Sequence, residues 1–279
     1  MRLRPQLYIQ VGSDEEFNLN DKIPDLKFLG LDGSPVVNNA YTDNNGVDGS
    51  VLNYSTFSRS TITANFYMHF SDWRNFQGLK DRIYKLFDNR QVIRLRTDAQ
   101  PNMAIYVRST SFDIKQTMDR SQDTTISIVF DNPTGYKYSL LRTDAMTDLF
   151  DDYPLGYDIP IQTADDYYAT GNSITILNGG DVAIDPYYQH HDLKVKIHYA
   201  GDELAIYNHT NDSSWRLTKT LTKSDVVLID GIDTYVNGTL ATDSTDYNTL
   251  VLDVGQNDLA IGGSSDFDVT FSFPYVFLD

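Results

Sequence analysis

The chain has 279 residues, no cysteine and a formal net charge of −17 at pH 7. The lack of cysteine excludes a disulfide scaffold, a thiolate zinc site and a cysteine nucleophile. At roughly 150 residues per domain, the length favours two domains, each long enough to bury a core. No apolar run approaches the roughly 18 residues of a membrane span, and no secretion signal is visible, so we expect a soluble protein without membrane contact.

The first half predicts strands around a single helix. A short strand is predicted at Leu7–Val11, followed by turns, and residues 43–49 are rich in Asn, Asp and Gly, which tolerate positive φ. Apolar and polar residues then alternate from Ile62 to Phe70, as in a half-buried strand. Further strands are predicted at Val92–Arg96, Ala104–Ser111 and Thr124–Phe130.

Residues 71–89 carry the helical pattern. Apolar residues recur there at spacings of three and four and form one stripe along a helix. Asp72 stands where it suits the helix dipole. The members of the stripe are Trp73, Phe76, Leu79, Ile83, Leu86 and Phe87.

Residues 140–160 have no sustained period and are interpreted as a connector between a domain at 1–139 and a domain at 161–279. The second domain predicts short strands with frequent Gly turns, typical of a sandwich or jelly roll. The strands predicted there are Ile174–Leu177, Leu193–Tyr199, Leu204–Asn208, Trp215–Leu221, Val226–Ile229, Leu250–Val254, Leu259–Ile261 and Phe267–Phe273.

The net charge is confined to the second half. Residues 1–139 carry 16 basic and 16 acidic side chains, whereas residues 140–279 carry 6 basic and 23 acidic ones, a net charge of −17. A domain this acidic repels nucleic acid and anionic lipid. The basic residues Arg94, Arg96 and Arg108 could line a nucleic-acid channel, but solvated faces or salt bridges between subunits are the preferred interpretation.

Nothing in the sequence predicts a catalytic, metal or cofactor site. His190 and His191 beside Asp192 could bind a metal only from a loop, because neighbours on a strand point to opposite faces. Residues 43–49 lack the oxygen ligand that a calcium loop needs at its fifth position, so a plain glycine turn is preferred. Paired carboxylates at Asp151-Asp152 and Asp165-Asp166 are expected by chance among so many aspartates.

Aromatic residues of the second half could stack on sugar faces, although packing in the core or between strands is the simpler interpretation. The candidates for contact with a glycan are Tyr187, Tyr188, Trp215 and Tyr235, with Tyr207 as a further aromatic residue of the same kind.

The order of elements from Gly46 to Ser139 resembles the siphophage tail-protein family, the distal tail proteins of long-tailed phages. The resemblance rests on the loop Gly46-Val47-Asp48-Gly49, the strand Ile62–Phe70, the helix, a strand region at Asp113–Thr125, and the segment from Ile126 to Pro133. The second half resembles the C-terminal module of that family. Its matching segments are 178–182, 206–208, 225–230, 235–238, 255–257 and 267–273.

This resemblance implies a mainly β fold: an N-terminal β-sandwich with one helix, then a jelly roll of galectin-like or carbohydrate-module-like type. It implies a structural protein without enzymatic activity or cofactor, assembled in the virion at the distal end of the tail after synthesis in the host cytoplasm. The implied partners are other copies in a hexameric ring, the tail tube protein, the tail-associated fibre or lysin protein, and in some relatives a receptor-binding protein.

The charge division suggests that residues 1–139 make the ring and that the acidic domain sits at its periphery, since crowding such charge is costly. Two alternatives stay open. One is a carbohydrate-binding adhesion module that recognises the host cell wall, and the other, weaker one is a glycosidase.

Overall fold

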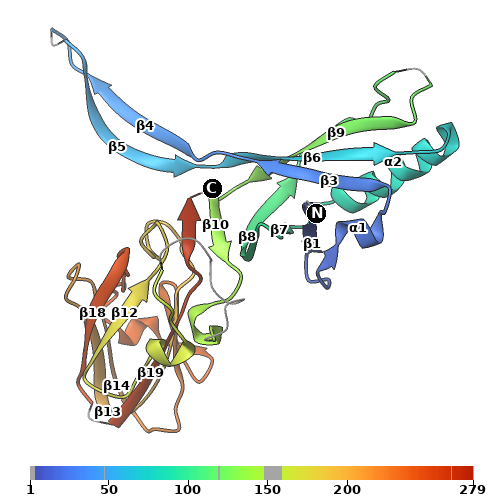
Figure 1. Cartoon of the computed structure of the whole chain (residues 1–279). Coiled ribbons are helices and arrows are strands. Elements are labelled where there is room, and N and C mark those ends of the chain that lie inside the picture. The colour runs from blue at the N-terminus through green and yellow to red at the C-terminus, as the bar shows by residue number, and fades with distance from the viewer. Residues whose placement is uncertain (1–3, 47, 119, 148–158, 265, 279) are drawn as a thin grey trace. The chain divides into compact units, whose positions relative to one another are not determined.

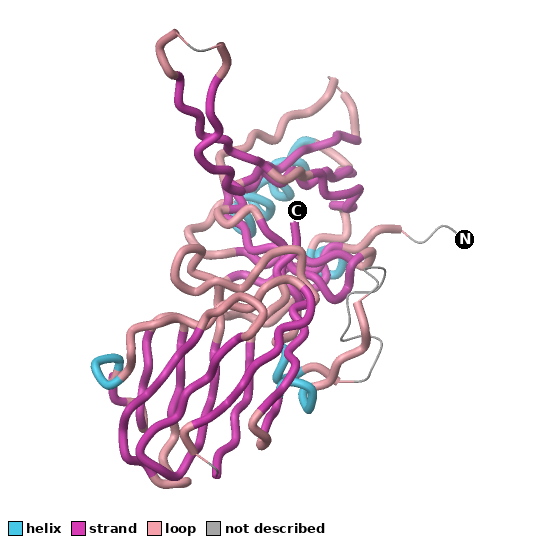
Figure 2. Tube along the Cα trace, turned by 90° about the vertical axis from the view of Figure 1, so that its left-hand side faces the viewer, coloured by secondary structure: helices cyan, strands magenta, loops and turns pink. Residues whose placement is uncertain are grey.

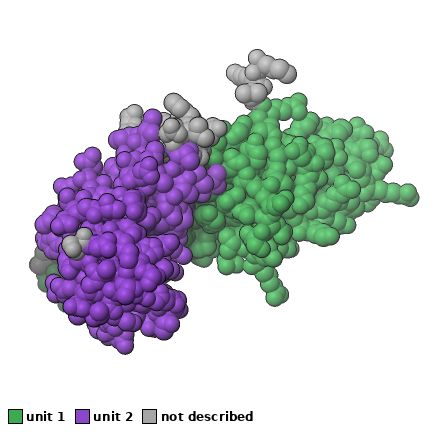
Figure 3. Space-filling view, turned by 90° about the horizontal axis from the view of Figure 1, so that it is seen from below, with its two compact units in different colours: residues 1–137, 278–279 green, residues 138–277 purple. Residues whose placement is uncertain are grey.

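The computed structural model describes residues 4–46, 48–118, 120–147, 159–264 and 266–278 (Figure 1). The chain divides into two compact units, residues Met1–Lys137 with Leu278–Asp279, and residues Tyr138–Phe277 (Figure 3). Most of the predicted connector falls on residues 148–158, which lie outside the described residues.

The first unit combines antiparallel strands with two helices. Its main sheet has the order β2-β1-β7-β8-β9-β6-β3, with β10 paired to β8, while β4 and β5 form a sheet of their own. The elements are β1 (Leu7–Val11), β2 (Phe17–Asn18), α1 (Leu19–Lys22), β3 (Leu26–Asp32), β4 (Val36–Asp43), β5 (Ser50–Ser58), β6 (Ser60–His69), α2 (Trp73–Phe87), β7 (Ile93–Thr97), β8 (Gln100–Ser109), β9 (Asp123–Asn132) and β10 (Tyr136–Ser139).

Helix α2 follows from its sequence. The Asp72 carboxylate accepts a hydrogen bond from the Asn75 amide at 2.9 Å and caps the N-terminus. The buried stripe contains Phe76, Leu79, Ile83 and Phe87. Trp73 departs from the predicted stripe: it is 60% exposed and stacks on Phe76 with ring centroids 5.4 Å apart.

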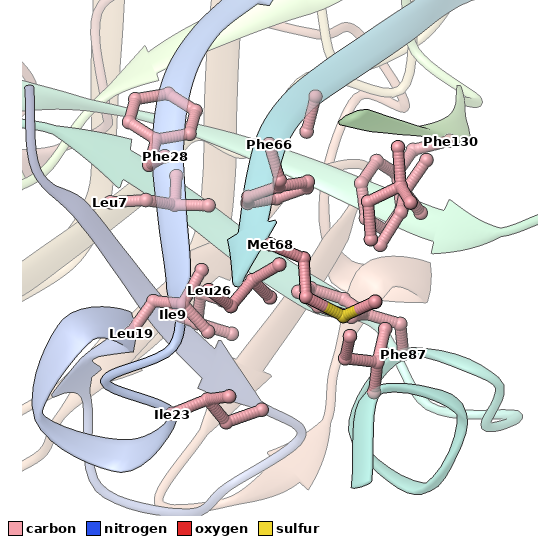
Figure 4. Close-up of a cluster of buried hydrophobic side chains, with 14 of the residues drawn as sticks. Leu7, Ile9, Leu19, Ile23, Leu26, Phe28, Phe66, Met68, Phe87 and Phe130 are labelled. Carbon is pink, nitrogen blue, oxygen red and sulfur yellow. The ribbon is translucent and has the colours of Figure 1, made fainter. Parts of the chain in front are cut away.

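The core of the first unit lies where this helix meets the sheet. Phe66 of β6 packs against Phe87 of α2, and Phe87 packs in turn against Phe130 of β9, with ring centroids 6.0 and 5.6 Å apart (Figure 4). The alternating strand predicted at Ile62–Phe70 is therefore correct, because its inward residues are those that meet the helix.

The second unit holds two antiparallel sheets that share β13 (Figure 2). One sheet has the order β11-β19-β13-β15-β16-β17, and the other joins β12, β18, β13 and β14. Its elements are β11 (Tyr168–Ala169), β12 (Ser173–Asn178), β13 (Lys194–Asn208), β14 (Ser214–Leu221), β15 (Val227–Asp230), β16 (Asp233–Val236), β17 (Thr239–Leu240), β18 (Gly255–Gly262) and β19 (Asp266–Ser272), with 3₁₀ turns at Thr143–Ala145, Ala164–Tyr167 and Thr242–Ser244. The last strand, β20 (Val276–Leu278), pairs with β10 and belongs to the sheet of that strand.

The fold class expected from the sequence is confirmed, since the chain is mainly β with α2 in the first half. Several details of the prediction are wrong. The predicted strands Leu193–Tyr199 and Leu204–Asn208 are one strand, bent at a bulge where Gly201 has φ +146°. Leu250–Val254 contributes only an isolated bridge from Leu252 to Ile184.

The strand region expected at Asp113–Thr125 begins only with β9 at Asp123, and no described residue from 113 to 122 lies in a strand. No strand is predicted from the sequence at β3, β4 or β5, although these strands make a large part of the first unit.

Candidate functional site

The most unusual surface of the first unit is a long hairpin, which we call the arm and define as residues 36–58, the strands β4 and β5 with their turn. Figures 1 and 2 show it standing away from the rest of the unit. The two strands pair antiparallel from Val36↔Ser58 to Asp43↔Ser50, with a bulge opposite Ala40 and Tyr41. The glycine turn predicted at residues 43–49 is confirmed, because Gly46 and Gly49 have φ of +81° and +83°.

Seven large apolar side chains of the arm are exposed to solvent, by 39–59% of their surface. Because cross-strand partners share a face, the pairs Val37↔Phe57 and Tyr41↔Leu52 lie on one face, and Tyr54, opposite Ala40, lies on the other. Apolar residues therefore occupy both faces of the ribbon. The full set is Val36, Val37, Tyr41, Val51, Leu52, Tyr54 and Phe57.

An arm of this composition is a binding surface. A lone two-stranded hairpin is marginally stable in water, and its outer backbone edges remain open to further pairing. Large contiguous apolar patches on soluble proteins mark interaction sites. The arm therefore has the exposed apolar character that is typical of interaction surfaces.

Polar pairs and a packed base hold the arm in shape. Ser55 donates a hydrogen bond to Asn39 at 2.6 Å, and Asn53 donates one to Thr42 at 2.7 Å. At the base, Phe57 meets the Tyr136 ring edge-on at 6.0 Å. The ribbon thus keeps its register although no core covers it.

Two of the predicted glycan residues are available at the surface. Tyr187 and Tyr188 are exposed and their rings meet edge-on at 4.8 Å. The Asp185 carboxylate accepts hydrogen bonds from both of their backbone amides, at 2.9 and 3.0 Å. This turn presents a pair of aromatic rings to solvent, as stacking on a sugar requires.

The other candidates do not join this pair. Trp215 is only 3% exposed and donates its indole N–H to the Thr234 hydroxyl at 3.1 Å, so its prediction as a sugar contact is wrong. Tyr235 is half-buried on β16. Tyr207 lies on β13, where it donates a hydrogen bond to Asp212 and packs edge-on against His209 at 4.8 Å.

The histidine pair forms no metal centre in the described residues, which contain no group of three or more His, Asp or Glu placed to hold an ion. His190 adopts φ +55°, and His191 is buried, with its Nδ1 2.8 Å from the Ala183 carbonyl oxygen. Burial lowers the pKa of His191, against the opposing effects of that backbone contact and of Asp185.

The acidic pairs are also explained locally. Asp165 and Asp166 lie in the 3₁₀ turn Ala164–Tyr167, where the Asp166 carboxylate accepts a hydrogen bond from the Thr163 backbone amide at 2.7 Å. Asp151-Asp152 lies outside the described residues.

The arginines considered for nucleic acid have partners within the first unit. Arg94 and Arg96 both bind the Glu16 carboxylate, and the Arg96 guanidinium lies 4.2 Å from the centre of the Tyr8 ring. Arg108 donates to the Arg90 carbonyl at 3.0 Å. Burial acts to raise the pKa of Glu16, but the hydrogen bond and charge of Arg96, followed by those of Arg94, outweigh it and hold that pKa below its ordinary value of 4.5.

Among the described helices, none is long and apolar enough to cross a membrane. The features that remain for function are the exposed arm and the tyrosine pair. The sequence predicts the tyrosine pair as a candidate for contact with a glycan, but it predicts neither strand of the arm.

Comparison with known proteins identifies a domain in the first unit and the fold of the chain. Residues 14–130 match the family model of the phage tail protein RIFT-related domain. No curated protein matches the chain. The solved structure of the SPP1 Dit protein, described as a paradigm of hub adsorption apparatus in Gram-positive infecting phages, is 10% identical and superposes with a TM-score of 0.70 over 96% of this chain and 99% of that one.

A chain of the phage p2 baseplate in its activated conformation with Sr is 13% identical over 96% of this chain and 97% of that one, with a TM-score of 0.42. The arm, α2 and the strands β3, β6, β7 and β8 fall inside the matched residues 14–130. Residues 14–130 therefore match a phage tail protein RIFT-related domain, and the chain has the fold of the SPP1 Dit protein over nearly its whole length.

Proposed function

We propose that this protein is a non-enzymatic structural hub at the distal end of a siphophage tail, where copies of the chain assemble into a hexameric ring. The ring would join the tail tube protein to the tail-associated fibre or lysin protein, and in some phages would carry a receptor-binding protein. The exposed arm supports this proposal most directly, because it is an apolar surface that only another protein can cover.

The charge distribution also supports a ring made by the first unit. Residues 1–137 and 278–279 carry 16 basic and 17 acidic side chains, whereas residues 138–277 carry 6 basic and 22 acidic ones. A nearly neutral surface can pack against copies of itself, while a unit with a net charge of −16 is costly to crowd. We therefore place the acidic unit at the periphery of the ring.

Removal of the apolar arm surface tests the assignment. The triple variant Tyr41→Ser, Leu52→Ser, Tyr54→Ser keeps every buried residue of the core intact. We expect wild-type protein to form annular particles in negative-stain images and the variant to run as a monomer in light scattering, with unchanged circular dichroism. The control replaces exposed residues outside the arm, Met118→Ser and Tyr247→Ser, and should still assemble. Wild-type protein that stays monomeric at high concentration would contradict the ring.

A second candidate function, adhesion to host cell-wall glycan, is favoured only by the exposed rings of Tyr187 and Tyr188. Sedimentation with purified host cell walls separates it from the hub function. We expect a protein with this function to bind cell walls strongly as wild type and to lose that binding in Tyr187→Ala and Tyr188→Ala while it still assembles. That result would support adhesion as a second function. Binding that does not depend on these rings would remove the glycan site.

A further inference from the structure

A groove in the first unit has the chemistry to receive the arm. It lies between α1, the turn after β1 and the C-terminal half of α2, and its volume is about 790 Å³. The floor is apolar, because Val11, Phe17 and Leu86 line it while they pack, partly buried, against the core. We call this surface the α2 groove.

The rim of the α2 groove is mainly basic. Four exposed basic side chains line the rim, compared with two acidic ones, Asp14 and Glu15. The basic residues are Lys22, Arg82, Lys85 and Arg90. The Lys22 Nζ atom lies over the Phe17 ring, 4.0 Å from the ring centroid. None of the ion pairs between described residues of the first unit involves these four basic side chains.

The arm carries the opposite charge. Its 23 residues contain two acidic side chains, Asp43 and Asp48, and no lysine or arginine. Both acids lie at the end of the ribbon beyond Tyr41 and Leu52, so apolar and acidic groups follow one another along the arm. The α2 groove offers an apolar floor and a basic rim, so an arm that lies lengthwise across it can set Tyr41 and Leu52 over the floor and both acids at the rim.

An arm cannot fill the groove of its own chain. Figure 1 shows β4 and β5 leading away from the main sheet on the side opposite to α1 and α2. A contact between the two surfaces therefore joins different copies head to tail. Repeated contacts of this heterologous kind generate a ring when the rotation between copies closes.

We propose that the tip of the arm of one copy docks in the α2 groove of the next copy, with Tyr41 and Leu52 near the apolar floor and Asp43 and Asp48 near the basic rim. This inference rests on the proposed ring and names the two surfaces that build it. The occupant of the groove is a second copy of this chain, because the chain itself supplies the matching charge and apolar surface.

Disulfide trapping tests the contact directly, since the protein has no cysteine of its own. The paired variant Asn45→Cys, Lys85→Cys places one thiol on the arm and one at the groove. Mild oxidation should link its copies into a ladder beyond the dimer on non-reducing gels, because every copy offers both partners. Each single variant can give a dimer at most.

The matched control is Asn45→Cys with Met118→Cys, which places the second thiol on another exposed site of the first unit. It should give no ladder under the same oxidation. A ladder of equal yield from this control would overturn the docking site, and so would the lack of a ladder from Asn45→Cys, Lys85→Cys in protein that forms rings.

Charge exchange gives an independent readout. Lys85→Glu and Asp48→Lys alone should each weaken self-association about tenfold, as expected for close charge pairs at an interface. The double variant should recover most of that loss. Single variants that associate like wild type overturn the docking inference but leave the ring intact, whereas wild-type protein that never self-associates overturns both proposals.

Discussion

At the scale of single residues, two aromatic side chains that look alike in the sequence have opposite roles. Trp215 packs in the core of the second unit and Tyr188 is 77% exposed. Trp215→Ala should lower the free energy of unfolding by about 3–5 kcal/mol, because it leaves a large cavity. Tyr188→Ala should change that free energy by about 0.5 kcal/mol or less. Urea denaturation followed by circular dichroism measures both.

This difference decides how a glycan assay is interpreted. Loss of cell-wall binding in Trp215→Ala would report unfolding, whereas loss in Tyr188→Ala would report a missing contact. Equal stability losses in the two variants would mean that the tyrosine ring is also part of the core. The sequence predicts a strand from Trp215 and none at Tyr188, but it could not show that the Trp215 ring faces the core, because burial depends on the partner sheet.

The Glu16 carboxylate makes the stability of the first unit depend on pH. Its side chain and those of Arg94 and Arg96 are only 16–21% exposed, and both arginines hold the pKa of Glu16 below 4.5. A lowered folded-state pKa stabilises the fold fully above the ordinary pKa of 4.5, and this contribution is lost as the pH falls through the folded-state pKa.

Glu16→Gln tests this dependence. Near pH 7 the variant should be less stable than wild type by about 2 kcal/mol, because the charge-assisted hydrogen bonds are weakened. The difference should shrink as the pH falls below 4.5 and through the lowered folded-state pKa, where the carboxyl group of wild type becomes protonated. Urea denaturation of both proteins across this range checks the trend, and a difference that stays constant would show that another group dominates.

At the scale of elements, α2 and the arm show what the sequence could and could not reveal. Helix α2 was predictable because Phe76, Leu79 and Ile83 face one core and repeat with the helical period. The arm has no buried face, so β4 and β5 show no alternation of apolar and polar residues. Its conformation comes from cross-strand pairing, which leaves no such period in the sequence.

The base of the arm depends on one glycine. Gly135 has φ +71°, and a Cβ atom there would lie 2.3 Å from the Ser58 carbonyl oxygen at the end of β5. Gly135→Ala should therefore destabilise the first unit by about 2 kcal/mol or more and displace the arm. Gly46→Ala at the tip is the matched control, because its φ is also positive, at +81°, but no atom lies within 4 Å of the new Cβ.

Thermal unfolding and light scattering of both variants check this expectation. Gly46→Ala should show only the cost of the strained backbone and should still assemble, whereas Gly135→Ala should lose both stability and assembly. Equal behaviour would mean that the contact with Ser58 does not orient the arm.

At the scale of the whole molecule, composition was informative where local pattern was not. The sequence showed that net charge is concentrated after residue 139, although it could not show which surfaces of the first unit meet. Net charge is a sum over many residues, so an error in the predicted bounds of a single strand does not change it. A contact surface depends on side chains brought together from β1, α1 and α2, which no local window contains.

The proposed peripheral position of the acidic unit leads to a last prediction about charge. Surface charges farther apart than the Debye length, about 8 Å at physiological salt, are largely screened from one another. If the acidic units of neighbouring copies stand apart, the variant Asp165→Asn, Asp202→Asn, Asp243→Asn, which removes three exposed charges, should assemble as wild type does at physiological salt. Sedimentation velocity over a concentration series measures the association constant of each protein. Stronger assembly of the triple variant would show that the acidic units are crowded within the ring, because removing repulsion helps only where the charges meet.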